Sequence, residues 1–327
     1  MPNVRSAIAH AIHKKFGWSS VAVAFSLLIV AVAALTLFHV FREIELGRVI
    51  RALKAQSLSQ LLLSRGFVVA GYLALTFYDV FALRAIGRGE VPYRVAAFAS
   101  FTSYTIGHNF GAAVFTSGFV RYRIYSAWGL SVREIARIAF ITGLTYWLAN
   151  GLVLGGGALL APDAASAIDH LPVSVNRLFG IAALAAIGGY LLWLRHSPRA
   201  IGPSGWRIVL PNVPSTLVQI GIGSLDLIFV ALTMYALLPA QPAVDVLDLI
   251  VIFVAAMLMG VVSHVPGSLG VMEAAMFIGL PEVGKEELLV SLVTFRVLYF
   301  LLPLLLATLL LGLREFRSVA AGIARTL

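Results

Sequence analysis

The sequence predicts an all-α protein that crosses a membrane several times. Of its 327 residues, 60% are hydrophobic and only 12% are charged, which is too little polar surface for a water-soluble protein. The apolar residues form stretches long enough to cross a hydrocarbon core of about 30 Å at about 1.5 Å per residue. Only short polar connections remain between these stretches, which excludes a soluble catalytic domain.

Full membrane spans account for most of the apolar residues. Because lipid offers the backbone no hydrogen-bond partners, we expect each span to be a helix. The first candidate is longer than the apolar region of a secretory signal peptide, so we expect it to be retained. The six predicted spans cover residues 18–40, 61–83, 136–160, 177–194, 213–238 and 288–312.

Two further apolar stretches, residues 95–119 and 249–280, are interrupted in their middle. The first carries several hydroxyl, imidazole and amide side chains, with Gly107 and Gly111 beside them. The second is broken at residues 263–270, where proline and glycine make a regular helix costly. The breaking residues there are Pro266, Gly267 and Gly270. We therefore predict that each stretch forms a re-entrant helical hairpin.

The charges in the loops agree with this topology, because arginine and lysine of short loops accumulate on the cytoplasmic side. With two hairpins, the basic segment 121–137 and both chain termini lie in the cytoplasm, and most acidic loop residues lie outside. A full crossing by either hairpin would move a basic segment outward. The basic stretch 42–54 does not fit, and we interpret it as an amphipathic helix on the membrane surface.

The sequence predicts one integral membrane domain made of two halves, residues 1–165 and 166–327. Each half holds three full spans and one hairpin, and an odd number of spans inverts the second half. Residues 107–111 (Gly-His-Asn-Phe-Gly) align with residues 263–267 (Ser-His-Val-Pro-Gly). Inverted repeats with broken helices near the bilayer midplane are typical of transporters.

Composition excludes several kinds of function. The chain has no cysteine, which excludes thiol catalysis, iron–sulfur clusters and disulfides. The net charge of +9 comes mostly from loops between apolar stretches, so we expect no nucleic-acid partner. No histidine or carboxylate spacing typical of a metal site occurs, and we expect neither metal nor cofactor.

Charged residues within the apolar stretches are few, and four of them are candidate functional residues: Asp79, Asp226, Glu273 and Arg296. Each costs about 2.5–3.5 kcal/mol at a helix centre, so each calls for a reason. Arg296 paired with Asp226 or Glu273 would be an architectural ion pair, whereas an accessible Arg296 would bind a lipid phosphate. For Asp79, the alternative is an interfacial pair with Arg84.

Other candidates flank the two breaks. His108 and His264 occupy matched positions, and Asn109 follows His108. Each histidine is either a hydrogen-bonded core residue or a member of a proton relay. Arg121 follows the first hairpin. It is either a topology signal or a phosphate ligand, because arginine holds phosphate with two parallel hydrogen bonds.

The glycine-containing break resembles a known signature. Residues 265–273 (Val-Pro-Gly-Ser-Leu-Gly-Val-Met-Glu) are similar to the Pro-Gly-Gly-Leu-Gly-x-x-Glu motif of the lysylphosphatidylglycerol synthase transmembrane-domain family, the flippase part of the bacterial multiple peptide resistance factor. Residues 108–111 and 118–125 resemble that family's Asn-x-x-Gly and Arg-Tyr-x-x-Tyr regions, and residues 78–79 its Tyr-Asp pair. Ser268 replaces the second glycine of the motif.

The resemblance implies a bacterial inner-membrane flippase, without catalytic residues, that moves aminoacylated or anionic phosphatidylglycerol between leaflets and lowers sensitivity to cationic antimicrobial peptides. It gives weight to Asp79, Arg121 and Glu273. The implied partners are a membrane phospholipid, a separate aminoacyl-lipid synthetase and further copies of the chain. The alternatives are a lipid-modifying enzyme with a histidine base, and a non-catalytic partner of a synthetase.

Overall fold

The computed structural model describes residues 50, 54, 56–110, 113–195, 199–202 and 207–324. Within these ranges the protein is almost entirely helical, which confirms the predicted all-α membrane fold. The one sheet among the described residues pairs β1 (Ala200–Ile201) with β2 (Ile208–Val209) in antiparallel fashion. This small hairpin joins α8 to α9 and was not predicted, because four strand residues leave no periodic pattern.

Five helical segments of the described chain are long and apolar enough to cross a membrane. They agree with five of the six predicted spans; the sixth, residues 18–40, lies outside the described residues, as does most of the stretch 42–54. The segments are α3 (Leu58–Ala85), α6 (Val132–Leu160), α8 (Val173–Arg195), α9 (Val213–Leu237) and the continuous Lys285–Phe316. The last segment contains α12 (Lys285–Phe295), a π-helical turn η3 (Arg296–Leu301) and most of α13 (Leu302–Ala324).

Polar residues set where these helices begin. Ser57 and Gln60 form a reciprocal capping box at the start of α3, and Ser131 and Glu134 form another at the start of α6. Each box satisfies two backbone N–H groups that would otherwise lack a partner. Asn212 caps α9 through its side-chain oxygen, which accepts the Ser215 N–H. The spans therefore start where the sequence changes from polar to apolar.

The first predicted hairpin is present. It consists of α4 (Tyr93–Phe110) and α5 (Ala113–Tyr125), which pack against each other and are followed by η1 (Ser126–Trp128). The 13 residues of α5 extend about 20 Å, which is too short to cross the hydrocarbon core. Gly107 is buried within α4, whereas Gly111 lies outside the described residues.

The second predicted hairpin is also present, as α10 (Val246–Val262), the short η2 (Pro266–Ser268) and α11 (Val271–Gly279). Its turn needs four residues with positive φ: His264 at 57°, Gly267 at 59°, Ser268 at 54° and Gly270 at 79°. Glycine adopts this conformation without strain. The glycines and Pro266 at the break therefore form the turn that the sequence predicted.

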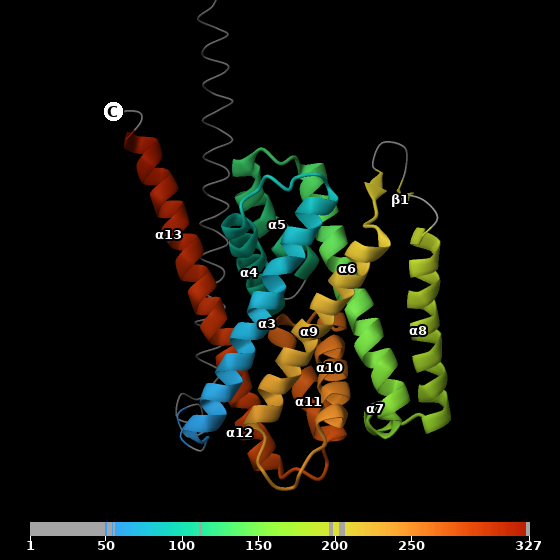
Figure 1. Ribbon diagram of the computed structural model, residues 1–327. Helices are drawn as coiled ribbons and strands as arrows, with labels where there is room; N and C mark the ends of the chain where they lie inside the picture. The colour runs from blue at the N-terminus through green and yellow to red at the C-terminus, as the bar shows by residue number, and fades with distance from the viewer. Residues whose placement is uncertain are drawn as a thin grey trace, which may run out of the picture.

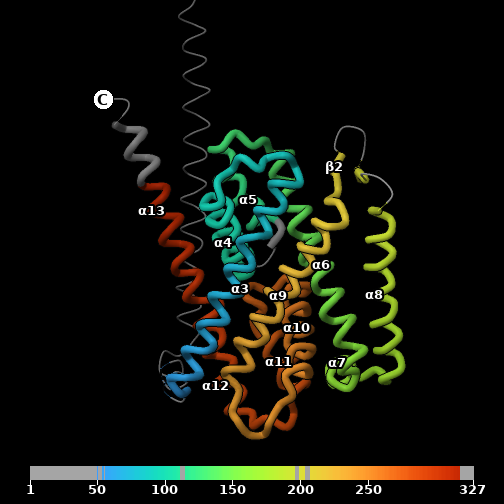
Figure 2. Tube along the Cα trace, viewed as in Figure 1, coloured from blue at the N-terminus to red at the C-terminus, as the bar shows by residue number. Residues whose placement is uncertain are grey.

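The two hairpins occupy opposite halves of the bundle. In Figures 1 and 2, α4 and α5 lie in the upper half and α10 and α11 in the lower half, with the long helices α3 and α9 crossing between them. The tip of the second hairpin, η2, packs against α4. The short helix α7 (Pro162–Asp169) turns the chain from α6 into α8 at the lower end.

Candidate functional site

A buried ion pair fastens the first hairpin to α3. The Arg121 guanidinium donates to Asp79 through Nη2 at 2.7 Å and through Nε at 3.1 and 3.2 Å. The Tyr125 hydroxyl donates to the same carboxylate at 2.7 Å. Asp79 is 0% exposed and Arg121 is 2% exposed. The carboxylate thus has a bidentate cation and a phenol, the set of partners that a buried charge requires.

Aromatic rings surround this pair. The Arg121 guanidinium carbon lies 5.0 Å from the centre of the Tyr104 ring, a cation–π distance. Tyr104 in turn makes edge contacts with Tyr78 and His108. Two interpretations of the sequence are therefore wrong for these residues: Asp79 pairs with Arg121 rather than with Arg84, and Arg121 is a buried partner rather than a surface topology signal.

A second buried arginine holds the tip of the other hairpin. Arg296 donates through Nε to the Glu273 carboxylate, through Nη1 to the Gly267 carbonyl at 2.8 Å and through Nη2 to the Ser268 carbonyl at 3.3 Å. The other oxygen of Glu273 accepts the Gly270 N–H at 2.8 Å. Of the two partners the sequence left open for Arg296, the structure selects Glu273.

Arg296 stands at the start of the π-helical turn. In a π-helical turn the backbone hydrogen bonds span five residues instead of four, and such turns are frequent at functional sites. In a regular α-helix the Tyr299 carbonyl would accept from residue 303, which is a proline without an N–H. The Tyr72 hydroxyl of α3 donates to this carbonyl instead, at 3.0 Å. Pro303 and Tyr72 together therefore stabilise the irregular turn that positions Arg296.

Asp226 in α9 joins neither ion pair. It is 5% exposed, and its Oδ2 accepts a long hydrogen bond of 3.4 Å from Tyr78. Its Oδ1 has no hydrogen-bond partner among the described residues. Burial of a charged carboxylate without a cation is costly. Asp226 therefore differs from Asp79 and Glu273, each of which is paired with an arginine.

The residues at the two breaks meet through backbone rather than through imidazoles. A Cβ on Gly267 would lie 4.0 Å from the Asn109 carbonyl, and the Asn109 side chain donates to the Thr105 carbonyl at 2.8 Å. His108 is half-buried against Tyr104, whereas His264 is exposed and hydrogen-bonds within its own turn to the Val262 carbonyl. Both histidines thus contact their own hairpins.

Among the grooves on the outside of the bundle, two are lined in part by α4 or α5 of the first hairpin and lie apart from the buried pairs. One of about 750 Å³ runs between α5 and α6 and is lined by apolar and aromatic residues, among them Phe119 and Trp147. The other, of about 400 Å³, runs between α3, α4 and the last span and includes Arg65. Neither groove reaches Asp79, Arg121, Glu273 or Arg296, so this conformation closes the ionic residues off from both grooves.

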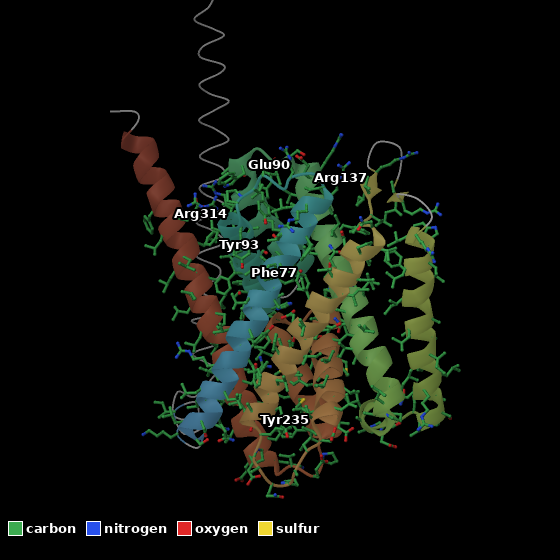
Figure 3. All side chains as sticks on the ribbon, viewed as in Figure 1. Phe77, Glu90, Tyr93, Arg137, Tyr235 and Arg314 are labelled. Carbon is green, nitrogen blue, oxygen red and sulfur yellow. The ribbon has the colours of Figure 1, made fainter. Side chains whose placement is uncertain are left out.

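Charged residues gather at the ends of the bundle. Figure 3 places Glu90, Arg137 and Arg314 toward the upper end and Tyr235 toward the lower end. At the upper end, Arg88 bridges Glu134 at 2.5 Å and Glu90 at 3.2 Å, which ties the loop before the first hairpin to α6. The backbone N–H of Glu90 and the Arg88 guanidinium lower the pKa of the Glu90 carboxyl.

The sequence analysis assigned no role to three residues that the structure places at the ion pairs or at a groove. Tyr125 lies four residues after Arg121 and therefore on the same helix face, a spacing that could have marked it. Tyr72 gave no local signal, because its partner is 227 residues away. Arg65 lies inside the predicted span 61–83 and is a charge in an apolar stretch like the four that were singled out.

Comparison with known proteins finds relatives over most of the chain. No protein-family model matches it, so the resemblance to the lysylphosphatidylglycerol synthase transmembrane domain stays a prediction. The inner membrane protein YbhN of Escherichia coli is 28% identical over 294 residues, 88% of this chain and 90% of YbhN. The uncharacterized protein slr0712 of Synechocystis is 32% identical over 253 residues, 76% of this chain and 77% of slr0712. The chain therefore belongs to the family of the Synechocystis protein slr0712.

Proposed function

We propose that the protein is a phospholipid translocase of the bacterial inner membrane, and that it moves an aminoacylated or anionic phosphatidylglycerol-type lipid between leaflets. One observation carries the proposal. Two helical hairpins from opposite halves of the bundle approach each other, and each is held by an arginine–carboxylate pair; the first pair is fully buried, and the second has a buried arginine and a partly buried carboxylate. The similarity to the inner membrane protein YbhN supports the inner-membrane location.

The physical requirement for such an activity is a polar path through the bilayer. A charged head group that leaves water without compensation loses its hydration, at a cost of several kcal/mol or more. In our proposal the halves 1–165 and 166–327 form an inverted repeat, and the hairpin tips line the path at its narrowest point. This is the arrangement in which transporters place broken helices near the midplane.

The buried pairs give the proposal a mechanism. With both pairs formed, the conformation described here is the closed state. A lipid phosphate replaces Asp79 or Glu273 on the guanidinium, since arginine binds carboxylate and phosphate with the same fork geometry. Removing one partner from a buried pair costs about 3–5 kcal/mol, so the incoming phosphate must supply a comparable interaction. The released carboxylate is then free to balance a lysyl ammonium group.

Asp226 has a separate part in the proposal. As a buried carboxyl without a cation among the described residues, it is the main candidate for proton coupling, together with the two histidines. An imposed pH gradient is expected to bias the direction of lipid movement in the wild type and to lose that effect in Asp226→Asn.

The experiment is leaflet exchange in proteoliposomes. Fluorescent phosphatidylglycerol, lysylphosphatidylglycerol and phosphatidylcholine are compared, with an impermeant quencher reporting the outer leaflet. We expect faster exchange of one of the first two lipids than in empty liposomes, and loss of that gain in Arg296→Gln. Exchange equal to empty liposomes for all three lipids would reject the proposal.

The same liposomes separate the alternatives. Mass spectrometry of the recovered lipids would detect a chemical change, which would point to a lipid-modifying enzyme. Unchanged lipids and no exchange, with a synthetase that co-purifies from cells, would point to a non-catalytic partner. Each outcome assigns a different role to Arg121 and Arg296.

A further inference from the structure

Arg65 is a charged residue on the lipid-facing side of α3. It lies seven residues after Leu58, about 10 Å along the helix axis. Its side chain is exposed, and its neighbours Leu62 and Val69 are 60% and 53% exposed. No ion pair joins Arg65 to a carboxylate in the part of the chain that the structure describes. A charge in such a place is costly unless an anion meets it.

Arg65 also stands at one end of the groove of about 400 Å³. On one side the groove follows α3 from Arg65 to Thr76, a distance of about 16 Å. Ala97 and Phe101 of α4 and Leu302 and Leu306 of α13 form the other walls. The length is about half of a hydrocarbon core of about 30 Å, which is the depth of one leaflet.

We propose that this groove binds one phospholipid molecule, with the Arg65 guanidinium on the lipid phosphate and an acyl chain along α3, α4 and α13. Charge complementarity selects the occupant, because the cation stands at the end of an otherwise apolar channel. The start of α3 lies at the end of the bundle that the loop charges assign to the outside. The lipid therefore belongs to the outer leaflet.

The groove also lies beside the irregular turn of the last span. Tyr72 lines the groove, and its hydroxyl holds the Tyr299 carbonyl within the π-helical turn that begins at Arg296. A bound lipid thus contacts the element that positions Arg296. Resting on the proposed function, the inference names this groove as the position from which a lipid approaches the second hairpin.

The test is photo-crosslinking in nanodiscs that contain phosphatidylglycerol with a diazirine on one acyl chain. In the wild type, the label is expected on the peptides that hold Leu73 and Leu306. Arg65→Gln should lower labelling roughly tenfold, as for the loss of a charge-assisted contact. Leu306→Trp, at a half-exposed side chain of the groove, should lower it as well.

The matched control is Arg177→Gln, an exposed arginine near the start of α8 at the same end of the bundle and outside this groove. It should label as the wild type does. Gel filtration and melting temperature show whether each variant is folded. Labelling that is unchanged in Arg65→Gln, or that lies away from the groove, overturns the inference. Competition by inorganic phosphate alone would also overturn it, because it would indicate a phosphate site that needs no acyl chain.

Crosslinking and leaflet exchange test the lipid site and the translocase activity separately. Groove labelling without leaflet exchange would leave the lipid site standing and reject the translocase. Leaflet exchange with no label in the groove would reject the site and leave the translocase standing.

Discussion

The carboxylate of Asp79 accepts hydrogen bonds from two side chains of α5, and these bonds replace the water that burial removes. Arg121 is equally dependent on its partner, because its guanidinium lies in a 2% exposed position against Tyr104. The packing of the first hairpin on α3 therefore requires both charges. The pair itself adds little net stability, but removing one partner leaves the other as an uncompensated buried charge.

This dependence predicts a non-additive double-mutant cycle. Asp79→Asn and Arg121→Gln should each lower the free energy of unfolding by about 3–5 kcal/mol, because each leaves one buried charge without its partner. The double variant should lose less than the sum of the two. Thermal unfolding in detergent measures all four proteins, with the exposed Arg177→Gln as a control. Additive losses would mean that the two side chains do not interact in the folded protein.

A second prediction concerns the Tyr72 hydroxyl and Pro303. Tyr72→Phe removes the donor to the Tyr299 carbonyl and should cost about 1 kcal/mol. Pro303→Ala restores an N–H that is able to reach the same carbonyl, so Tyr72→Phe should cost less in that background. Melting temperatures of the four proteins test this. An equal cost in both backgrounds would show that the proline is not what leaves the carbonyl free.

The sequence identifies buried charged residues more readily than it identifies their partners. A charge in an apolar stretch is conspicuous, so Asp79, Asp226, Glu273 and Arg296 could be identified. Their partners were harder to assign: the sequence left two candidate carboxylates for Arg296, and Arg121 is 42 residues from Asp79, so only the folded chain brings that pair together. The unpartnered Oδ1 of Asp226 is likewise a property of packing between α3 and α9 and leaves no pattern in the sequence.

At the scale of elements, the second hairpin depends on a close approach between α10 and its own turn. A Cβ on Gly260 would lie 2.3 Å from the Ser268 Oγ and 2.4 Å from its Cβ. Real Cβ atoms do not come this close, so Gly260 lets Ser268 tuck against the helix. Ser268 also offers its carbonyl to Arg296, which links this packing to the second ion pair.

Gly260→Ala is therefore expected to destabilise the protein and to displace the hairpin tip. Gly221→Ala is the matched control, since that glycine is also inside a helix and a Cβ there would meet nothing within 4 Å. In the control, alanine should be neutral or should add up to about 1 kcal/mol, because it favours the helix. Comparison of the two melting temperatures decides the point: equal values would show that the approach of Ser268 is not required.

The helices themselves were largely predictable, for a physical reason. Hydrophobicity and the need to satisfy backbone hydrogen bonds in lipid fix where a span can lie, and α3, α6, α8, α9 and the last span follow. Proline and glycine then located the hairpin turns. By contrast, the short helix α7 and the β1–β2 hairpin are too short to show a hydrophobic pattern, and tertiary packing stabilises them: α7 lies against α6, α8 and α10, and Ile208 is buried in the core.

At the scale of the whole molecule, the bundle separates its loop charges between two ends. The connection from α3 to α4 and the starts of α4 and α6 carry Arg88, Arg94 and Arg133, whereas α7 and the connections before α10 and α12 carry Asp163, Asp245 and Glu282. In Figure 1 the connection from α3 to α4 and the start of α6 lie at the upper end, and α7 lies at the lower end with the connections before α10 and α12. Positive loops stay in the cytoplasm, so the upper end is expected to face the cytoplasm.

Single cysteines test this orientation directly, because the natural chain has none. Glu90→Cys, in the exposed loop before the first hairpin, should react with a membrane-impermeant maleimide only after the cells are permeabilised. Glu282→Cys, in the exposed loop before α12, should react in intact cells. The reverse pattern would turn the bundle over. It would then place the Arg65 groove in the inner leaflet, so the same experiment also fixes which leaflet supplies the lipid that this groove is proposed to bind.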